Sequence, residues 1–169
     1  HSTDTHGTNK ANFLTLNIFG YKFAPRYSSL FDKVTESLYG FKHPSKYKGL
    51  IKPIRKINTK LITSEWGDIQ RVFVSLALKT TTQSIIMGKL SAYTRKNKTR
   101  QAIWEYDSIF RSLHLLELID SPQMRRNIQK ALNRGEGYHQ LKRAVAFANF
   151  GKLRFKTEYE QKIWGECSR

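Results

Sequence analysis

The sequence predicts a mainly α-helical chain with a small α/β part at its start. From residue 59 onward, apolar residues recur at every third or fourth position, as they do on one face of a helix. Before residue 59, apolar-aromatic runs alternate with Gly- and Pro-containing stretches, which is typical of short strands and loops. The 169 residues are 39% hydrophobic and 12% aromatic, which is enough for a folded core.

The first element expected is a helix over residues 12–19. Phe13 and Leu16 recur there at helical spacing, and Gly20 offers a stop. Its candidate N-caps are Thr8 and Asn9.

The next element expected is a short strand over residues 21–27, an apolar-aromatic run that contains Pro25. Residues 39–58 follow, rich in Gly, Pro, Lys and aromatic residues. This composition predicts an irregular basic segment, and we expect a boundary between substructures there.

Helices are expected over most of the remaining chain. In residues 64–79, Ser64 is the candidate N-cap, and one apolar stripe is formed by Ile69, Val72, Phe73 and Leu76. A shorter helix is expected over residues 81–93. The longest candidate covers residues 97–119, with an inward stripe of Ile103, Tyr106, Phe110 and Leu113.

The last two expected helices are separated by the NRGEG stretch at residues 133–137. Ser121 as N-cap and Pro122 in the first turn start one of them, and Met124, Ile128 and Leu132 are expected to face inward. NRGEG is expected to end that helix, and a new one then runs from residue 138 to Gly151. Three segments result: 1–58 with the basic connector, 59–120 as a helical array, and 121–169 as closing helices.

The charge balance points to a polyanionic partner. Thirty Lys and Arg residues stand against 13 Asp and Glu, giving a formal net charge of +17. Such a field attracts phosphate backbones. Three basic groups stand out: residues 42–60, interleaved with Phe41 and Tyr47; residues 95–100; and residues 125–143. A solvated face is the alternative for each group, and around Glu136 phosphate binding is the favoured interpretation.

Several classes of protein are disfavoured. No stretch approaches the roughly 20 consecutive apolar residues of a membrane span. Cys167 is the only cysteine, which excludes an intramolecular disulfide and a cysteine zinc cluster. The five histidines show no paired metal-ligand spacing.

Two acids stand apart in this basic chain. Asp4 lies in the polar opening HSTDTHGTN, and Glu136 lies between two glycines and is expected at a helix start. Taken alone, Asp4 is explained as a cap or turn residue, and Glu136 as an acid that complements a helix macrodipole. Glu136 and His139 also form an E-x-x-H pair, a weak metal signal without a second copy.

A resemblance changes the weight of those two acids. The chain resembles the catalytic part of bacterial replicative transposases of the Tn-three family. The matching stretches appear in the family's order and cover nearly the whole chain; they include STDTHG, FGYKFAPR, GKLSAYTRKN, LNRGE followed by LKRA, and the closing IWGECSR.

The resemblance implies a partial RNase H-like core with a long helical insertion. In this family three carboxylates (Asp, Asp, Glu) hold the catalytic metals, and Asp4 and Glu136 match the second and third. Both are therefore expected to be catalytic and to bind Mg²⁺ in a two-metal site, where Mn²⁺ can substitute. The first Asp is expected upstream of residue 1, so the isolated 169 residues are expected to be an inactive piece of an enzyme.

The resemblance further implies that the partner is DNA, both transposon ends and target, with self-association of the intact transposase in the bacterial cytoplasm. The residues expected to contact DNA are Arg26, Arg125, Arg126, Lys130, Arg134, Lys142 and Arg143. The main alternative is a non-catalytic, basic, helical DNA-binding module in which both acids only cap helices. A second is a helical protein-interaction domain whose charge serves solubility.

Overall fold

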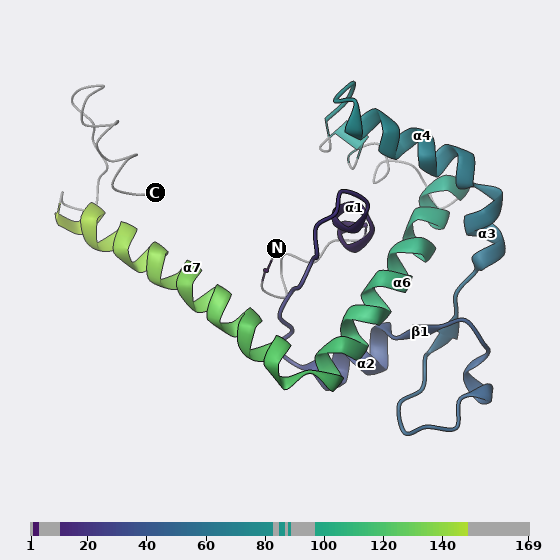
Figure 1. Cartoon of the computed structure of the whole chain (residues 1–169), viewed down its shortest axis with the longest axis horizontal. Coiled ribbons are helices and arrows are strands. Elements are labelled where there is room, and N and C mark those ends of the chain that lie inside the picture. The colour runs from purple at the N-terminus through teal and green to yellow at the C-terminus, as the bar shows by residue number, and fades with distance from the viewer. Residues whose placement is uncertain (1, 4–10, 83–84, 87, 89–96, 149–169) are drawn as a thin grey trace. The chain divides into compact units, whose positions relative to one another are not determined.

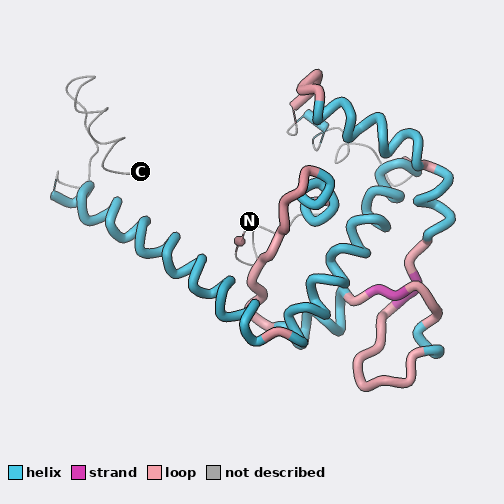
Figure 2. The backbone as a smooth tube through the Cα atoms, in the orientation of Figure 1, coloured by secondary structure: helices cyan, strands magenta, loops and turns pink. Residues whose placement is uncertain are grey.

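The computed structural model describes residues 2–3, 11–82, 85–86, 88 and 97–148. Figures 1 and 2 show that helices dominate this part of the chain, with one short pair of strands. The prediction of a mainly helical protein is therefore confirmed. The described elements are α1 (Asn12–Ile18), α2 (Leu30–Ser37), β1 (Tyr39–Gly40), the 3₁₀ turn η2 (Pro44–Lys46), β2 (Arg55–Lys56), α3 (Thr59–Ser64), α4 (Trp66–Ala77), α6 (Lys98–Asp120) and α7 (Pro122–Ala148).

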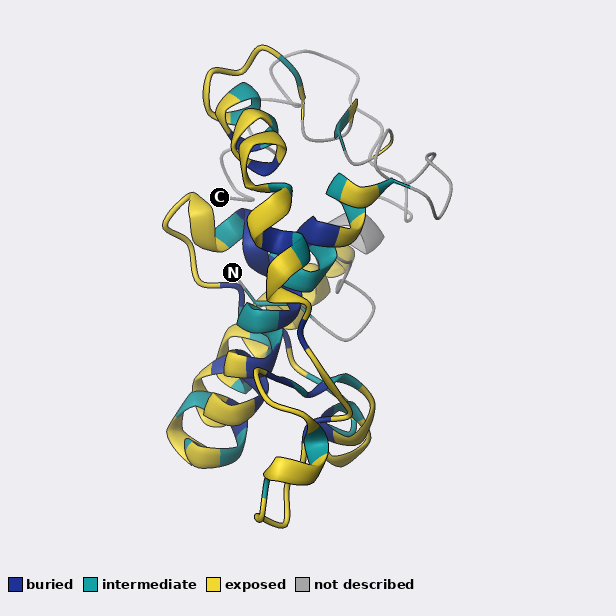
Figure 3. Ribbon diagram, turned by 90° about the vertical axis from the view of Figure 1, so that its right-hand side faces the viewer, coloured by how far each residue is buried: buried dark blue, intermediate teal, exposed yellow. Residues whose placement is uncertain are grey.

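Helix α6 is the element on which most of the others pack. Helices α1, α2, α3 and α4 and strand β1 all contact it, and buried residues gather along it in Figure 3. The main core cluster joins Leu14, Ile57, Ile69 and Ile103, each at most 1% exposed. A smaller cluster joins Val34 and Leu38 to Leu115. Residues from before and after position 59 thus share one core.

Side-chain caps start helices α2, α3 and α6. Ser29 Oγ accepts the N–H of Asp32 at 3.3 Å, and Asn58 Oδ1 accepts that of Leu61 at 3.1 Å. Asn97 Oδ1 accepts the N–H of Arg100 at 2.9 Å. Each bond satisfies one of the N–H groups that a helix start leaves unpaired.

The predicted start of α7 is confirmed and that of α4 is wrong. Ser121 Oγ accepts the N–H of Met124 at 3.1 Å, and Pro122 is the first helical residue. Ser64, by contrast, is the last residue of α3, and Glu65 precedes α4 without a side-chain cap bond. Asn58 starts a separate turn of helix upstream, which places Ser64 at a helix end.

The predicted apolar stripe of α4 is confirmed, and that of α6 is confirmed only in part. In α4, Ile69 and Phe73 are buried and Val72 and Leu76 pack against the core, as expected. In α6, Ile103 is buried but Leu113 is 52% exposed. The buried side of α6 instead includes Asp107, Ser108, Ser112 and His114. Backbone groups of neighbouring segments bond to three of these, and the Ser108 hydroxyl donates to Trp104 within α6.

Residues 39–58 are more ordered than expected. Strands β1 and β2 pair in parallel, with Tyr39 opposite Arg55 and Gly40 opposite Lys56. Ile57, directly after β2, is 1% exposed in the core. The expected strand over residues 21–27 is wrong, since no helix or strand forms in that segment. Pro25 offers no N–H to a ladder, which limits pairing there.

The expected break in NRGEG is also wrong. Helix α7 runs unbroken through residues 133–137 and, at 27 residues, is longer than the 23-residue α6. Two glycines cost a helix about 1 kcal/mol each relative to alanine. The good helix formers on both sides, such as Lys130, Leu132, Gln140 and Lys142, offset that cost.

By its contacts the chain divides into two units, residues 1–128 and 129–169, and α7 begins in the first and continues into the second. The three functional segments expected from the sequence remain a prediction. The expected caps Thr8 and Asn9, most of the helix at 81–93, and Gly151 lie outside the described residues.

Candidate functional site

The segment that carries Asp4 is held immediately before that residue. Asp4 itself lies outside the described residues, but its neighbour Thr3 is described. The backbone N–H of Arg26 donates to the carbonyl of Thr3 at 2.8 Å. The structure thus places Arg26 of the FAPR motif, an expected DNA contact, opposite Thr3, the residue that precedes Asp4.

The FAPR motif is in turn fixed to α6. His114 Nε2 lies 3.1 Å from the carbonyl oxygen of the fully buried Pro25. Burial lowers the pKa of His114 below its usual value, so the ring is neutral at pH 7. A carbonyl can only accept, so Nε2 carries the proton and donates it.

Contacts on either side reinforce this attachment. Lys22 Nζ pairs with Glu117 of α6 at 2.7 Å. The Phe13 and Phe23 rings meet edge to face, 4.8 Å apart, and Phe13 lies 5.5 Å from the His114 ring. Residues 13–25 therefore bind α6 through polar and aromatic contacts together.

A second attachment to α6 lies just after residues 4–10 along the chain. Asp107 of α6, 1% exposed, accepts the backbone N–H of Leu14 at 3.0 Å and pairs with Arg111 Nη2 at 3.0 Å. The residue before α1 is Ala11, which has φ of 77° and no capping side chain. Asp107 therefore satisfies the start of α1 from another helix.

The ionisation of Asp107 reflects competing effects. Burial raises the pKa of its carboxyl group, while the Arg111 guanidinium and the backbone N–H groups of Leu14 and Ala11 lower it. The sequence signal for this residue was present, because Asp107 lies four residues after Ile103 and three before Phe110 on a predicted apolar face. An acid in such a place is expected to be buried with partners.

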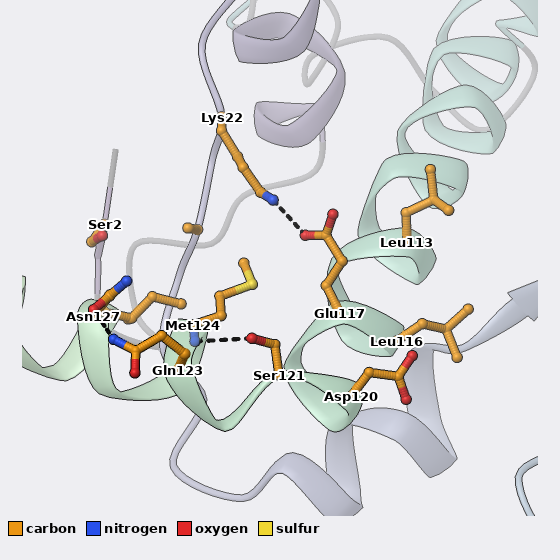
Figure 4. Close-up of a pocket in the computed structure, with 12 residues that line it drawn as sticks. Ser2, Lys22, Leu113, Leu116, Glu117, Asp120, Ser121, Gln123, Met124 and Asn127 are labelled. Atoms are coloured by element: carbon orange, nitrogen blue, oxygen red, sulfur yellow. Dashed lines mark hydrogen bonds and ion pairs between the residues drawn. The ribbon is translucent and has the colours of Figure 1, made fainter.

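Beside these attachments a hollow of about 770 Å³ opens where α6 ends and α7 begins. Figure 4 shows Lys22 reaching Glu117 across it, with Ser2 at its edge and Ser121 bonded to Met124. Ser2 is two residues before Asp4, so this hollow adjoins the Asp4 segment along the chain.

Glu136 lies in the middle of α7, and its expected position at a helix start is therefore wrong. It is 14 residues from the first residue of the helix and 12 from the last. The macrodipole acts within the first and last turns only. The helix-start explanation of this acid, which the sequence left open, does not apply.

The carboxylate of Glu136 is exposed, and within the described part of the chain no side chain pairs with it. Arg143 is the nearest expected DNA contact on the same helix face, two turns further on and about 10 Å along the axis. An oxygen donor left open in this way suits a hard divalent cation. Within the described residues, no group of three His, Cys, Asp or Glu side chains is placed to hold a metal, and Asp4 falls outside that set.

The other expected DNA contacts on α7 differ in their surroundings. Arg126, Lys130 and Arg134 follow at four-residue spacing and are exposed, which gives one row of cations. Lys142 Nζ lies 4.6 Å from the centre of the Tyr138 ring. Arg125 donates to the backbone carbonyls of Leu118 and, at 2.9 Å, Ile119, so it also caps the end of α6. DNA contact by these residues stays a prediction.

No helix in the described ranges is both long enough and apolar enough to cross a membrane.

Comparison with known sequences defines the class to which this arrangement belongs. The model of the Tn3 transposase DDE domain matches residues 1–169, and the chain belongs to that family. The resemblance to the Tn-three family inferred from the motifs is thereby confirmed.

Individual relatives are transposases of mobile elements. The transposase for transposon Tn1546 of Enterococcus faecium is 36% identical over 162 residues, which cover 95% of this chain and 16% of the relative. The transposase for transposon Tn2501 of Escherichia coli is 34% identical, covering 91% and 15%. That for transposon Tn21 of Escherichia coli is 32% identical, covering 96% and 16%. The chain thus spans about one sixth of the length of these relatives. No solved structure matches it.

Proposed function

We propose that this chain is part of the catalytic region of a DNA transposase that cuts DNA strands and joins their ends to other DNA. Asp4 and Glu136 are the proposed metal ligands. The observation that carries the proposal is Glu136 itself. It lies in the LNRGE stretch on which the resemblance to transposases rests, it is exposed in mid-helix, and no side chain of the described residues pairs with it.

The donor chemistry fits the ion. Carboxylate oxygens are the ligands Mg²⁺ prefers, and a pair of such ions supplies activation of the attacking oxygen and stabilisation of the leaving one in phosphoryl transfer. The chain's own residues position the segment that carries the proposed ligand Asp4. Helix α6 holds the chain before Asp4 through Arg26 and Pro25, and after it through Leu14. An RNase H-like core formed with chain outside these residues belongs to the proposal.

The proposed substrate is the DNA backbone. The net charge of +17 favours a polyanion, and Arg26 lies beside the residue before Asp4. Arg125, Arg126, Lys130, Arg134, Lys142 and Arg143 are the proposed phosphate contacts on α7. Self-association of the intact transposase is part of the same proposal, as is inactivity of the isolated 169 residues.

Strand cleavage by the full-length transposase that contains this chain tests the proposal. Glu136→Gln and Asp4→Asn are each expected to abolish Mg²⁺-dependent cleavage of a transposon-end duplex and to leave affinity for that duplex within about threefold. Gln140→Glu is a matched control, because it adds an acid one turn away on the same helix. Full cleavage by Glu136→Gln, with DNA binding unchanged, favours the non-catalytic DNA-binding module instead.

A further inference from the structure

A second concave site lies between α6 and the segment 41–54, which we call the 41–54 loop. The cavity has a volume of about 230 Å³ and is lined mainly by apolar groups, among them Phe41, Tyr47, Ile51, Leu113 and Leu116. It is smaller than the roughly 300–1,000 Å³ of sites that take drug-sized ligands. Its size and lining suit one planar ring system.

Specific backbone and side-chain contacts fix the shape of the cavity. The 41–54 loop is tied at both ends, because Ile54 N–H donates to Leu38 and Ile57 N–H donates to Gly40, each at 2.8 Å. Within the loop, Lys42 N–H donates to Tyr47 Oη at 3.3 Å. A Cβ added at Gly40 would lie 2.5 Å from Tyr47 Oη and 2.8 Å from Pro53 Cγ. Only glycine at position 40 lets Tyr47 and Pro53 pack this closely.

Apolar side chains at the mouth of the cavity remain exposed to solvent. Phe41 is 57% exposed, Ile51 43% and Leu113 52%. A cluster of large exposed apolar side chains around a concavity is typical of an interaction site.

The charge around this mouth selects the partner. Residues 38–64 contain no Asp or Glu and seven cations: Lys42, Lys46, Lys48, Lys52, Arg55, Lys56 and Lys60. The four lysines of the 41–54 loop are exposed, whereas Arg55 pairs with Glu105. Aromatic rings combined with unpaired lysines are the features that bind single-stranded nucleic acid, the rings by base stacking and the cations by phosphate contact.

We propose that the 41–54 loop and its cavity bind an unpaired nucleobase of DNA, with Phe41 stacked on the base and the loop lysines on the flanking phosphates. The proposal rests on the proposed function, since it names the form of DNA that this surface takes. A protein segment without acidic residues would find the same apolar lining but would gain nothing from the four lysines of the loop, whereas DNA carries a phosphate beside every base.

The test is binding of fluorescent DNA by the full-length transposase in EDTA, so that no cleavage step enters the measurement. Two DNAs are compared, a fully paired duplex and the same duplex with a short single-stranded extension. The variants are Phe41→Leu, which removes the aromatic ring, and Phe41→Tyr, which keeps it. Phe31→Leu is the matched control, because Phe31 of α2 is 76% exposed and lies outside the cavity.

Phe41→Leu is expected to weaken binding of the extended DNA by roughly 5- to 100-fold and that of the paired duplex by less than twofold. Phe41→Tyr and Phe31→Leu are expected to bind both DNAs like the unchanged protein. The proposal is overturned if Phe41→Leu weakens binding of the two DNAs equally or has no effect on either. It is also overturned if Phe41→Leu alters self-association and leaves DNA binding unchanged, a result that indicates a protein partner. None of these results bears on Glu136, whose test is loss of cleavage.

Discussion

The carboxylate of Asp107 accepts the backbone N–H of Leu14, a residue 93 positions earlier in the chain. This bond replaces the capping side chain that Ala11 cannot supply. One buried acid of α6 therefore fixes the place where the chain resumes after the Asp4 segment. The same acid balances the charge of Arg111.

Replacing Asp107 by Ala is expected to destabilise the chain by about 3 kcal/mol, because it leaves the mostly buried Arg111 without its partner and the start of α1 uncapped. Urea unfolding measures the change. Asp68→Ala is the control, since Asp68 and Arg71 form an exposed pair that is expected to contribute less than 1 kcal/mol. Similar losses from the two variants contradict this account of Asp107.

Acidification is expected to destabilise the chain through His114. Burial lowers its pKa in the folded state, with the Pro25 carbonyl and Glu117 raising it and Lys22 lowering it. Below about pH 6.5 the unfolded chain takes up a proton that the folded chain does not, so stability falls as pH decreases through that range. Urea midpoints between pH 5 and pH 8 measure the slope. His114→Gln is expected to reduce the slope, and an unchanged slope contradicts the assignment.

Alanine at Gly135 or Gly137 is expected to stabilise α7 by about 0.5–1 kcal/mol. Both glycines lie inside the helix, and an added Cβ meets no described atom within 4 Å at either position. Alanine removes the entropic cost of glycine in a helix. Helicity by circular dichroism, followed on heating, measures the effect. A loss of helicity indicates that NRGEG bends in solution.

Alanine at Gly40 is expected to destabilise the chain by about 1–3 kcal/mol, because the new Cβ overlaps Tyr47 and Pro53. Thermal unfolding measures the difference. Gly67→Ala in α4 is the matched control, with nothing within 4 Å of its added Cβ, and it is expected to stabilise. Equal behaviour of the two variants contradicts the packing described for the 41–54 loop.

Neutralising Arg126, Lys130 and Arg134 together by Gln is expected to weaken DNA binding by the full-length transposase and to reduce the slope of log affinity against log salt by about 2 to 3. Fluorescence anisotropy over a range of NaCl concentrations measures the slope. The neutral replacement of Gln123 and Gln129 by Ala on the same helix serves as control. An unchanged slope removes these residues from the DNA contact.

The sequence predicted the helical character of the chain, the start of α7 and the buried stripe of α4, because each depends on local periodicity or capping. It did not predict the unbroken α7, since the stabilising effect of the flanking helix formers outweighs two glycines. It also missed the pairing of β1 with β2, because two-residue strands carry no alternating pattern.

The candidate site, like the fold, was predicted only in part from the sequence. The metal-binding role of Glu136 came from the sequence by resemblance and stays a prediction, whereas its position in mid-helix was not predicted. The bonds of Pro25 to His114 and of Leu14 to Asp107 join residues far apart in sequence. No local pattern specifies such contacts, and only the placement of a buried acid and a buried imidazole on one helix hinted at them.

The dependence of residues 13–26 on α6 limits how the domain can be shortened or exchanged. The stretch between Asp4 and Glu136 cannot be treated as an optional insert, because its helix α6 supplies the surface on which residues 13–25 pack. A hybrid that took residues 1–26 from one relative and α6 from another would need matched partners for His114 and Asp107. Exchange between mobile elements is therefore expected to preserve this pairing as a block.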